Sequence, residues 1–298
     1  MKYSVNRVGP HTHLDVPLET LSHSDRLIIL DCAGGSTTTV PAGFAGLWWC
    51  IRGQALALSA DSRIALSRRW ILISDSQRSH SVAVQAGSHA FGLVGSQALW
   101  SSLITLFEEG SGGEPAVFPA LHMATATHCK KLLLFLRSAV PTEGDGLDAS
   151  KGMHLAMVIC ELQRLFAPLI ARCPGPSLSR RRTVFLRLQR VRNHLSHWTQ
   201  PNMDVGDLAL TTNYSIWRFI RVYCSVFGET PYSHISRLRV DRAKKLLEAG
   251  ELCVGDIALA VGFENGSSLT RAIKKRYGLS ATEIRRFRNR LESSEAPT

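Results

Sequence analysis

The chain has 298 residues, a length that suggests two domains. Hydrophobic residues make up 45% of the sequence and charged residues 20%, which excludes a disordered or low-complexity chain and is ordinary for a globular protein. The formal net charge is +11, and residues 177–298 carry +10 of it, with 21 Lys and Arg against 11 Asp and Glu. Such a local excess favours a polyanionic partner, because neutralised phosphates release counterions. A solvated basic surface is the alternative.

Cysteine usage and the N-terminus bear on location. The seven cysteines are scattered and none forms a CxxC pair, which is typical of reduced thiols in a cytosol. No apolar segment follows Lys2 and Arg7, so no signal peptide is expected. The most apolar helix candidate, 153–170, is too short and too polar to span a bilayer. The sequence predicts a cytoplasmic protein without a membrane partner.

Residues 25 to 96 predict a β-rich region. Short runs of β-branched, aromatic and aliphatic residues recur about every ten residues with turn residues between them, the rhythm of a small barrel or sandwich. The runs are Arg26–Asp31, Leu47–Ile51, Ala55–Ser59, Trp70–Ser74, Ser81–Val84 and Ala90–Val94. Gly53 is a plausible hairpin turn.

After residue 96 the apolar residues follow a helical period. Three helices are predicted, at Gln97–Glu109, Leu121–Ala139 and Met153–Ala167. The apolar stripe of the last helix packs on its own domain or, alternatively, forms part of a dimer seam over 153–170.

The sequence Cys173-Pro-Gly-Pro-Ser177, followed by Arg180-Arg-Arg182, indicates a linker, because prolines around a glycine cannot continue a helix. We therefore expect a front domain at 1–172, a linker at 173–182, a basic domain at 183–291 and a tail at 292–298. Thr183–Trp198 is an amphipathic helix expected to pack across the first part of the basic domain.

The basic domain contains one segment twice. Leu208-Ala209 recurs as Ile257-Ala258, 49 positions later, and Gly228 recurs as Gly278, 50 positions later. Each copy is predicted to form a helix, a turn and a second helix with basic residues outside, the helix-turn-helix layout whose second helix enters a DNA major groove.

In the first copy, Asp204 and Ser215 are placed to cap the two helices. Asn213 occupies the turn position that needs a left-handed backbone. The predicted inward residues of the reading helix are Phe219, Val222, Tyr223 and Val226, and the predicted outward residues are Trp217, Arg218 and Arg221. Arg221 suits bidentate contact with guanine, with phosphate contact or a surface role as alternatives, and Trp217 suits thymine methyls or sugar, with core packing as its alternative.

In the second copy Gly262 fills the turn position, and Glu264 or Asn265 opens the reading helix. Leu269 and Ile273 face inward, and the outward set is Gly266, Ser267, Thr270, Arg271, Lys274 and Lys275. Arg271 is the expected base reader and the lysines are expected phosphate contacts. A helix C-terminus that complements the macrodipole is the alternative for 274–276. The helix from Pro231 to Gly250 connects the copies and spans roughly 27 Å, close to one DNA turn.

The basic domain resembles the AraC/XylS family of bacterial transcription regulators. The marks of the resemblance are Leu208-Ala209, Ser215, Arg221, Gly228, Arg239, Ala243, Leu246-Leu247, Ile257-Ala258, Gly262-Phe263, Arg271, Lys274-Lys275, Gly278, Ser280 and Arg285. Leu269, Ile273, Ala281 and Ile284 depart from the usual residues, and Ile220 replaces a commonly polar one. The resemblance implies DNA contact by Trp217, Arg221, Ser267, Thr270 and Arg271.

The resemblance also implies an α+β protein of two domains, with a cupin-like β-barrel and appended helices in front of an all-α tandem helix-turn-helix domain. The front domain is expected to bind a small-molecule effector, with Trp48, Trp49 and Trp70 as candidate contacts and core packing as the alternative. Trp48 and Trp49 must point to opposite faces of one strand. A homodimer, double-stranded DNA and RNA polymerase are the other implied partners, and activation is favoured over repression.

Two other functions compete. A metal-dependent cupin enzyme would use His11, His13, His80 and His89, but no glutamate completes the usual cluster and no nucleophile–base pair is evident, so no metal, cofactor or catalytic residue is expected. A nonspecific architectural DNA binder does not need the long, nearly neutral front domain.

Overall fold

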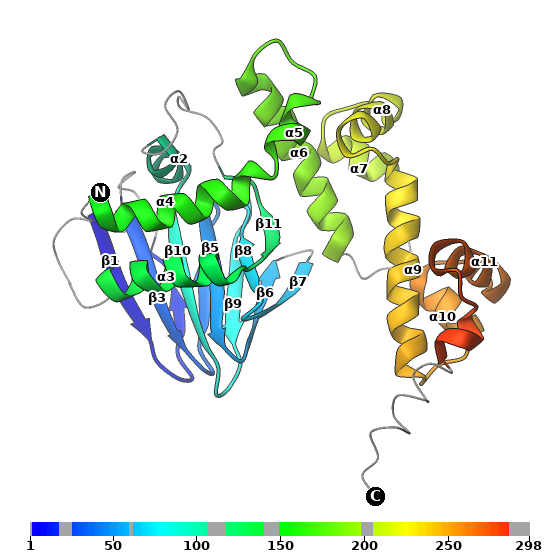
Figure 1. Cartoon of the computed structure of the whole chain (residues 1–298), viewed down its shortest axis with the longest axis horizontal. Helices are drawn as coiled ribbons and strands as arrows, with labels where there is room; N and C mark the ends of the chain where they lie inside the picture. The colour runs from blue at the N-terminus through cyan, green and yellow to red at the C-terminus, as the bar shows by residue number, and fades with distance from the viewer. Residues whose placement is uncertain are drawn as a thin grey trace, which may run out of the picture. The chain divides into compact units, whose positions relative to one another are not determined.

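The structure is a computed structural model that describes residues 2–17, 26–59, 62–105, 117–139, 149–197 and 205–285. The chain divides into two compact units, Met1–His197 and Trp198–Thr298. The described strands all belong to the first unit, and the second is helical, so the fold class is α+β as predicted (Figure 1). Asp204, the end of the helix predicted to reach Glu109 and the tail 292–298 lie outside the described residues.

The front unit contains two β-sheets. The larger sheet has the order β1-β3-β10-β5-β8-β11, with bounds Lys2–Val8, Arg26–Ala33, His89–Ser96, Phe44–Arg52, Trp70–Ile73 and Ala120–Met123. The smaller sheet has the order β2-β4-β9-β6-β7, with bounds His13–Asp15, Thr37–Val40, His80–Val84, Gln54–Ser59 and Ser62–Ser67. The strand pairings are antiparallel except those of β1 with β3 and β2 with β4. The edge strands of one sheet do not pair with those of the other over the described residues. The expected cupin-like barrel is therefore not closed, and the unit is an open sandwich with helices outside it.

The larger sheet is buried on both faces because its strands alternate apolar residues to either side. Leu27 and Ile29 of β3 pack toward the helices, whereas Ile28 and Leu30 pack between the sheets. The same alternation separates the adjacent tryptophans of β5. The unit is thus built in three layers, with the larger sheet in the middle.

Helices α2 (Gln97–Thr105), α3 (Ala126–Ala139) and α4 (Ala149–Arg164) form the third layer. Figure 1 shows α3 and α4 lying across the face of the larger sheet. The buried face of α4 packs in the shared core, in agreement with the prediction that its apolar stripe packs on its own domain; its buried residues are Leu155, Val158, Ile159 and Leu162. Leu165, beyond the end of α4, is 67% exposed. One predicted helix, 121–139, was wrong at its start. Residues 120–123 instead form strand β11, because they pair with the edge strand β8.

Trp48 lies flat against the sheet interior and needs two glycines to do so. A Cβ atom on Gly92, its cross-strand neighbour, would lie 2.4 Å from the indole ring, and one on Gly46 would lie 2.7 Å from the indole nitrogen. That nitrogen donates to Nε2 of His80 at 3.2 Å across the sandwich. Burial lowers the pKa of His80 to about 4, which keeps it a neutral acceptor at physiological pH.

The segment predicted as a linker begins inside the front unit. After α5 (Ala167–Ala171), Cys173 is buried, and α6 extends over Leu178–His197. Phe185 of α6 packs on Phe118 and Phe166, with ring centroids 5.0 and 5.2 Å apart. These aromatic contacts place α6 with the front unit, so the division between the units falls 15 residues after 182, where the expected linker ends.

Polar contacts also hold α6 in the front unit. Arg190 makes a bidentate pair with Asp75, at 2.7 and 2.9 Å. Nε2 of Gln189 donates to the carbonyl oxygen of Pro119 at 3.2 Å. Bidentate guanidinium–carboxylate pairing fixes direction as well as distance, so α6 has a defined orientation on this unit.

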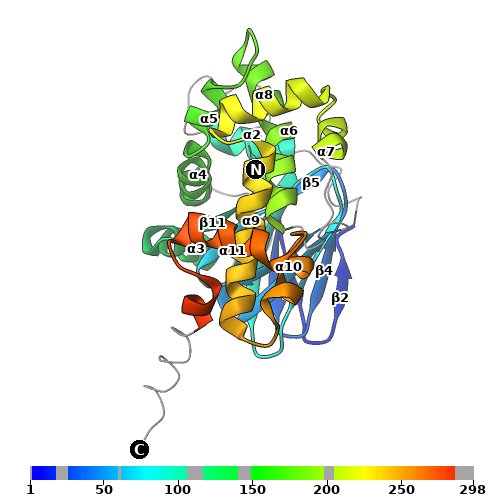
Figure 2. The ribbon, with the colours of Figure 1, turned by 90° about the vertical axis from the view of Figure 1, so that its right-hand side faces the viewer.

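The second unit consists of α7 (Val205–Thr211), α8 (Ile216–Phe227), α9 (Pro231–Ala249), α10 (Val254–Val261) and α11 (Gly266–Tyr277). The long helix α9 has α10 and α11 packed along its later half (Figure 2). Among the described helices of the chain, none combines the length and the apolar character needed to cross a membrane.

His122 gives the front unit a testable pH dependence. Its Nε2 atom is buried without a hydrogen-bond partner beside Phe166, and burial, aided by the nearby His128, lowers the pKa of His122 from 6.5 to about 4. Because the folded pKa lies below the unfolded one, the stability contributed by neutral His122 is present above pH 6.5 and is lost as the pH falls toward 4. The wild type should lose about 2 kcal/mol of its free energy of unfolding through this group when the pH falls from about 7 to 5, and His122→Leu should not have this loss. Urea denaturation at the two pH values measures this, with the exposed His13→Leu as control; equal pH dependence in wild type and His122→Leu would contradict it.

Candidate nucleic-acid interface

The first helix-turn-helix consists of α7 and α8. Asn213 between them has φ 57°, the left-handed conformation predicted for it. The N–H of Tyr214 donates to the carbonyl oxygen of Ala209 at 3.2 Å and closes the turn. Ser215 is the N-cap of α8 as expected, but its side chain makes no capping hydrogen bond.

Helix α8 has one buried and one exposed face. Phe219, Val222, Tyr223 and Val226 are buried, in agreement with the predicted inward set. Trp217 is 83% exposed, so its core alternative is excluded within this unit. Arg218 and Arg221 are also exposed, and the guanidinium of Arg218 lies over the Tyr214 ring, 5.0 Å from its centroid. The exposed face therefore presents two cations and one large aromatic side chain.

The second helix-turn-helix repeats the turn with a different residue. Gly262 has φ 85°, and the N–H of Phe263 donates to the carbonyl oxygen of Ala258 at 2.8 Å. Donor and acceptor each lie 49 positions after their counterparts in the first copy, so the sequence repeat is also a structural one. Asn265 caps α11 by accepting a hydrogen bond from the N–H of Ser268 at 2.9 Å.

Helix α11 buries Leu269 and Ile273 and exposes smaller polar residues. Gly266 and Thr270 are half-buried, and the Thr270 hydroxyl donates to the Gly266 carbonyl oxygen at 2.8 Å. The fully exposed members of the predicted outward set are Ser267, Arg271, Lys274 and Lys275. The small residues at the start of the helix leave room for close approach, and the cations lie farther along it.

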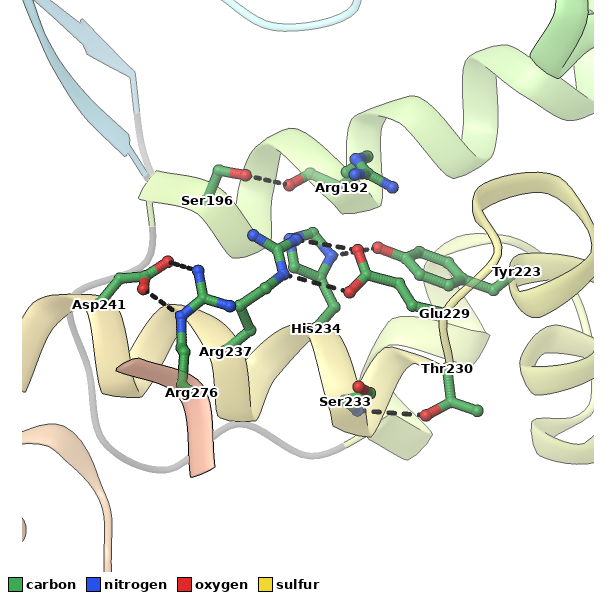
Figure 3. A network of polar contacts seen from close by, with 10 residues as sticks. All are labelled: Arg192, Ser196, Tyr223, Glu229, Thr230, Ser233, His234, Arg237, Asp241 and Arg276. Carbon is green, nitrogen blue, oxygen red and sulfur yellow. Dashed lines mark hydrogen bonds and ion pairs between the residues drawn. The ribbon is translucent and has the colours of Figure 1, made fainter. Parts of the chain in front are cut away.

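Helix α9 connects the two copies and has polar contacts at its first turns and near its middle (Figure 3). Thr230 caps it by accepting from the N–H of Ser233, and Pro231 is its first residue, as predicted. Arg237 pairs with Glu229 at 2.9 and 3.2 Å. Farther along, Arg239 donates to the Gly262 carbonyl oxygen at 2.8 Å, so α9 also satisfies the end of α10.

One member of the basic run 274–276 is held by another part of the same unit. Arg276 makes a bidentate pair with Asp241 of α9, at 2.6 and 2.9 Å. Sequence reasoning missed this contact. A signal was present, because at an offset of 50 Arg276 and Tyr277 stand opposite apolar Val226 and Phe227 of the first copy.

Comparison with known proteins identifies the domain. A helix-turn-helix family model matches residues 208–286. The probable transcriptional regulator LumQ of Photobacterium leiognathi is 26% identical over 102 residues, 34% of this chain and 41% of that protein. The regulator ExsA of Pseudomonas aeruginosa is 28% identical over 141 residues, 44% of this chain and 49% of that protein. Residues 208–286 form an AraC-type helix-turn-helix domain.

The likeness is confined to part of each protein. The chain spans less than half the length of LumQ or ExsA. Among solved structures, the C-terminal domain of the response regulator AraT from Geobacillus stearothermophilus is similar, with 26% identity and a TM-score of 0.30 over 36% of this chain and 85% of that one. The assignment of the AraC-type domain rests on the family model and the sequence relatives.

The candidate effector contacts of the front unit do not lie together on one surface. Trp48 is fully buried between the sheets, and Trp49, 2% exposed, packs under the helices with its indole nitrogen donating to the Arg68 carbonyl oxygen at 3.3 Å. Trp70 is half-buried and packs on the same inter-sheet core as Trp48. These positions agree with the core alternative for Trp48 and Trp49.

The four histidines considered for a metal are paired with other groups or lie apart. His13 contacts Asp15 at 2.9 Å, His89 contacts Asp31 at 2.5 Å, and His80 accepts from Trp48. Within the described ranges, no three metal-ligating side chains converge.

The turn residue of the first copy provides a stability test. Asn213→Gly keeps access to the left-handed conformation, whereas Asn213→Val places a β-branched side chain there. We expect Asn213→Val to lower the free energy of unfolding by about 1–2 kcal/mol relative to Asn213→Gly, because of the steric cost of the left-handed region. Denaturation curves of the two variants measure the difference, and equal stabilities would contradict this account of the turn.

Proposed function

We propose that this protein is a sequence-specific DNA-binding transcription regulator in which α8 and α11 read successive major grooves. The observation that carries the proposal is the pair of helices with buried inner faces and exposed polar outer faces, each held by the same turn hydrogen bond 49 positions apart. The family of the domain and the basic charge of residues 177–298 support it.

The side chains divide into base readers and phosphate contacts. Arg221 and Arg271 are the proposed base readers, because an exposed guanidinium can form a bidentate pair with guanine. Trp217 is proposed to contact thymine methyls or sugar, and Gly266, Ser267 and Thr270 permit close approach. The proposed contacts to the DNA phosphate backbone are Lys274, Lys275, Arg218 and the hydroxyl of Ser215, which makes no capping hydrogen bond.

The spacing of the two readers fits one face of DNA. Helix α9 has 19 residues, which corresponds to about 28 Å. Successive major grooves on one face are about 34 Å apart, so a helix of this length can connect readers in adjacent turns. The outward residues of the two readers differ, so each half of the site should have its own sequence.

The front unit is proposed to sense a small-molecule effector and to form a homodimer, and the protein to activate RNA polymerase. The support is the resemblance to the AraC/XylS family together with the position of α6. This helix ends at His197, shortly before the reader in the sequence, and is fixed to the front unit by Arg190 and Gln189. A ligand that shifts Asp75 or Pro119 would therefore shift α6. Such a shift would change the fraction of molecules whose helix-turn-helix domain is able to bind DNA.

The competing functions predict other behaviour. An architectural binder would bind DNA regardless of sequence. An enzyme would need a catalytic group, and the AraC-type domain is typical of regulators rather than enzymes.

Replacing the proposed readers should relax specificity in one half of the site at a time. Arg271→Ala should cost about 1–3 kcal/mol of discrimination at one half, and Arg221→Ala should do so at the other, because each loses a bidentate base contact. Lys275→Ala is the control and should weaken binding to all sequences alike. Affinities for single-base variants of a selected site measure this, and an unchanged preference in Arg271→Ala would remove that residue from the reader set.

The helix-turn-helix domain should bind DNA without the front unit. Because α6 belongs to the front unit, the fragment that tests this begins at Trp198. Its affinity should fall steeply with salt, by about a thousandfold from 50 to 200 mM if six phosphates are contacted. Fluorescence anisotropy at several salt concentrations measures the slope, and a folded fragment without DNA affinity would contradict the assignment.

A further inference from the structure

Each reading helix is tied to α9 by a polar contact in addition to its apolar core, and the two contacts differ in chemistry. In the first copy, the Tyr223 hydroxyl and Nδ1 of His234 lie 2.5 Å apart. Both side chains are buried, at 0% and 1% exposure. The orientation of α8 is thus set inside the core, where a mismatched polar pair would be costly.

In the second copy, the contact lies at the surface. Asp241 holds the guanidinium of Arg276 through both carboxylate oxygens, and the Tyr277 hydroxyl donates to the same carboxylate. The side chains of Arg276 and Asp241 are 34% and 31% exposed. One acidic residue of α9 therefore binds two consecutive residues in the last turn of α11.

The polar contact that each reading helix makes with α9 is not repeated in the other copy. At the offset of 50 that relates the reading helices, Tyr223 corresponds to Ile273, and Arg276 and Tyr277 correspond to Val226 and Phe227. Each copy is polar where the other is apolar. His234 and Asp241 are seven residues apart, nearly two turns, so they lie on about the same side of α9.

The apolar contacts of α11 thin out toward its last turn. Leu269 and Ile273 are its buried apolar residues, and Ala272 and Tyr277 beside them are only partly buried, so apolar packing fixes the end of the helix less firmly than its middle. The helix is about 18 Å long, so a tilt of about 10° at its last turn displaces its first turn by about 3 Å. Base readout requires side chains to be positioned within about 0.5 Å.

We propose that Asp241 is a specificity-determining positioning residue: by holding Arg276 and Tyr277 it sets the angle at which α11 presents Arg271 to the second half of the DNA site. The proposal rests on the DNA-reading function proposed above. It also assigns Arg276 to the protein's own framework rather than to phosphate, in contrast to Lys274 and Lys275.

A purely stabilising role for Asp241 makes a different prediction. A partly exposed ion pair stabilises a fold by only about 0–1 kcal/mol. Its loss would then leave the folded population, and hence the preference for DNA sequence, nearly unchanged. A positioning role instead predicts a large change in preference at one half-site with little change in stability.

The test uses the full chain and a duplex of about 30 base pairs that the wild type selects from a randomised library, a length that covers both half-sites. Affinities are measured for this duplex, for versions with either half scrambled, and for a random duplex. The variants are Asp241→Asn, Arg276→Gln and their combination. Glu248→Gln is the matched control, because it removes an equal charge from the same helix, at a residue that pairs with Lys244 of α9 at 2.9 Å.

We expect Asp241→Asn and Arg276→Gln each to reduce the preference for the native second half about tenfold and to leave the preference for the first half unchanged. The double variant should lose no more than either single variant, because both remove the same contact. Glu248→Gln should keep both preferences, and thermal unfolding should change little in all variants.

Two results would overturn the role of Asp241: an unchanged second-half preference in either single variant, or losses that multiply in the double variant. If Asp241→Asn does not fold, Arg276→Gln breaks the same pair from the other side and decides alone. If the wild type selects no sequence, the proposed function fails as well, whereas selection by the wild type with unaffected variants overturns the positioning role only.

Discussion

A single left-handed residue before each reading helix is the constraint on which the second unit depends. At Asn213 and Gly262 the chain reverses just enough for the following N–H to reach back five residues to a carbonyl oxygen of the supporting helix. That bond closes the turn and brings the two helices into contact. The turn in this way decides which side of the reading helix is buried against the supporting helix and α9, and which side remains for another molecule.

Much of this unit could be predicted from the sequence because its determinants are local. The turn residues follow from backbone sterics, and the inward positions Phe219, Leu269 and Ile273 follow from helical periodicity. The pairing of Asp241 with Arg276 could not: the comparison of the two copies marks Arg276 as unusual, but its partner lies 35 positions away and an ion pair leaves no periodic pattern that identifies it. For the same reason α6 was assigned to the wrong side of the domain boundary, since Phe118 and Asp75, which hold it, are far away in the sequence.

Strand β11 and the open sandwich show a second limit. Residues 120–123 alternate too briefly to be distinguished from a helical start, and only their pairing with β8 makes them a strand. The strand rhythm of residues 26–96 agrees equally with a barrel and with a sandwich, because local alternation does not reveal whether two edge strands meet. Trp48 and Trp49 illustrate the strength of alternation, since the prediction that they point to opposite faces is confirmed.

The flat placement of Trp48 has a consequence for how the front unit can change over time. Its ring occupies the space that side chains at Gly46 and Gly92 would need. Substitutions at these three positions, on two strands, therefore depend on one another. A larger residue at either glycine is tolerated only after the tryptophan has become smaller, whereas loss of the tryptophan alone leaves a void above both glycines. The order in which substitutions arise is therefore restricted, and a sandwich interior with a different shape is reached only by way of a less stable intermediate protein.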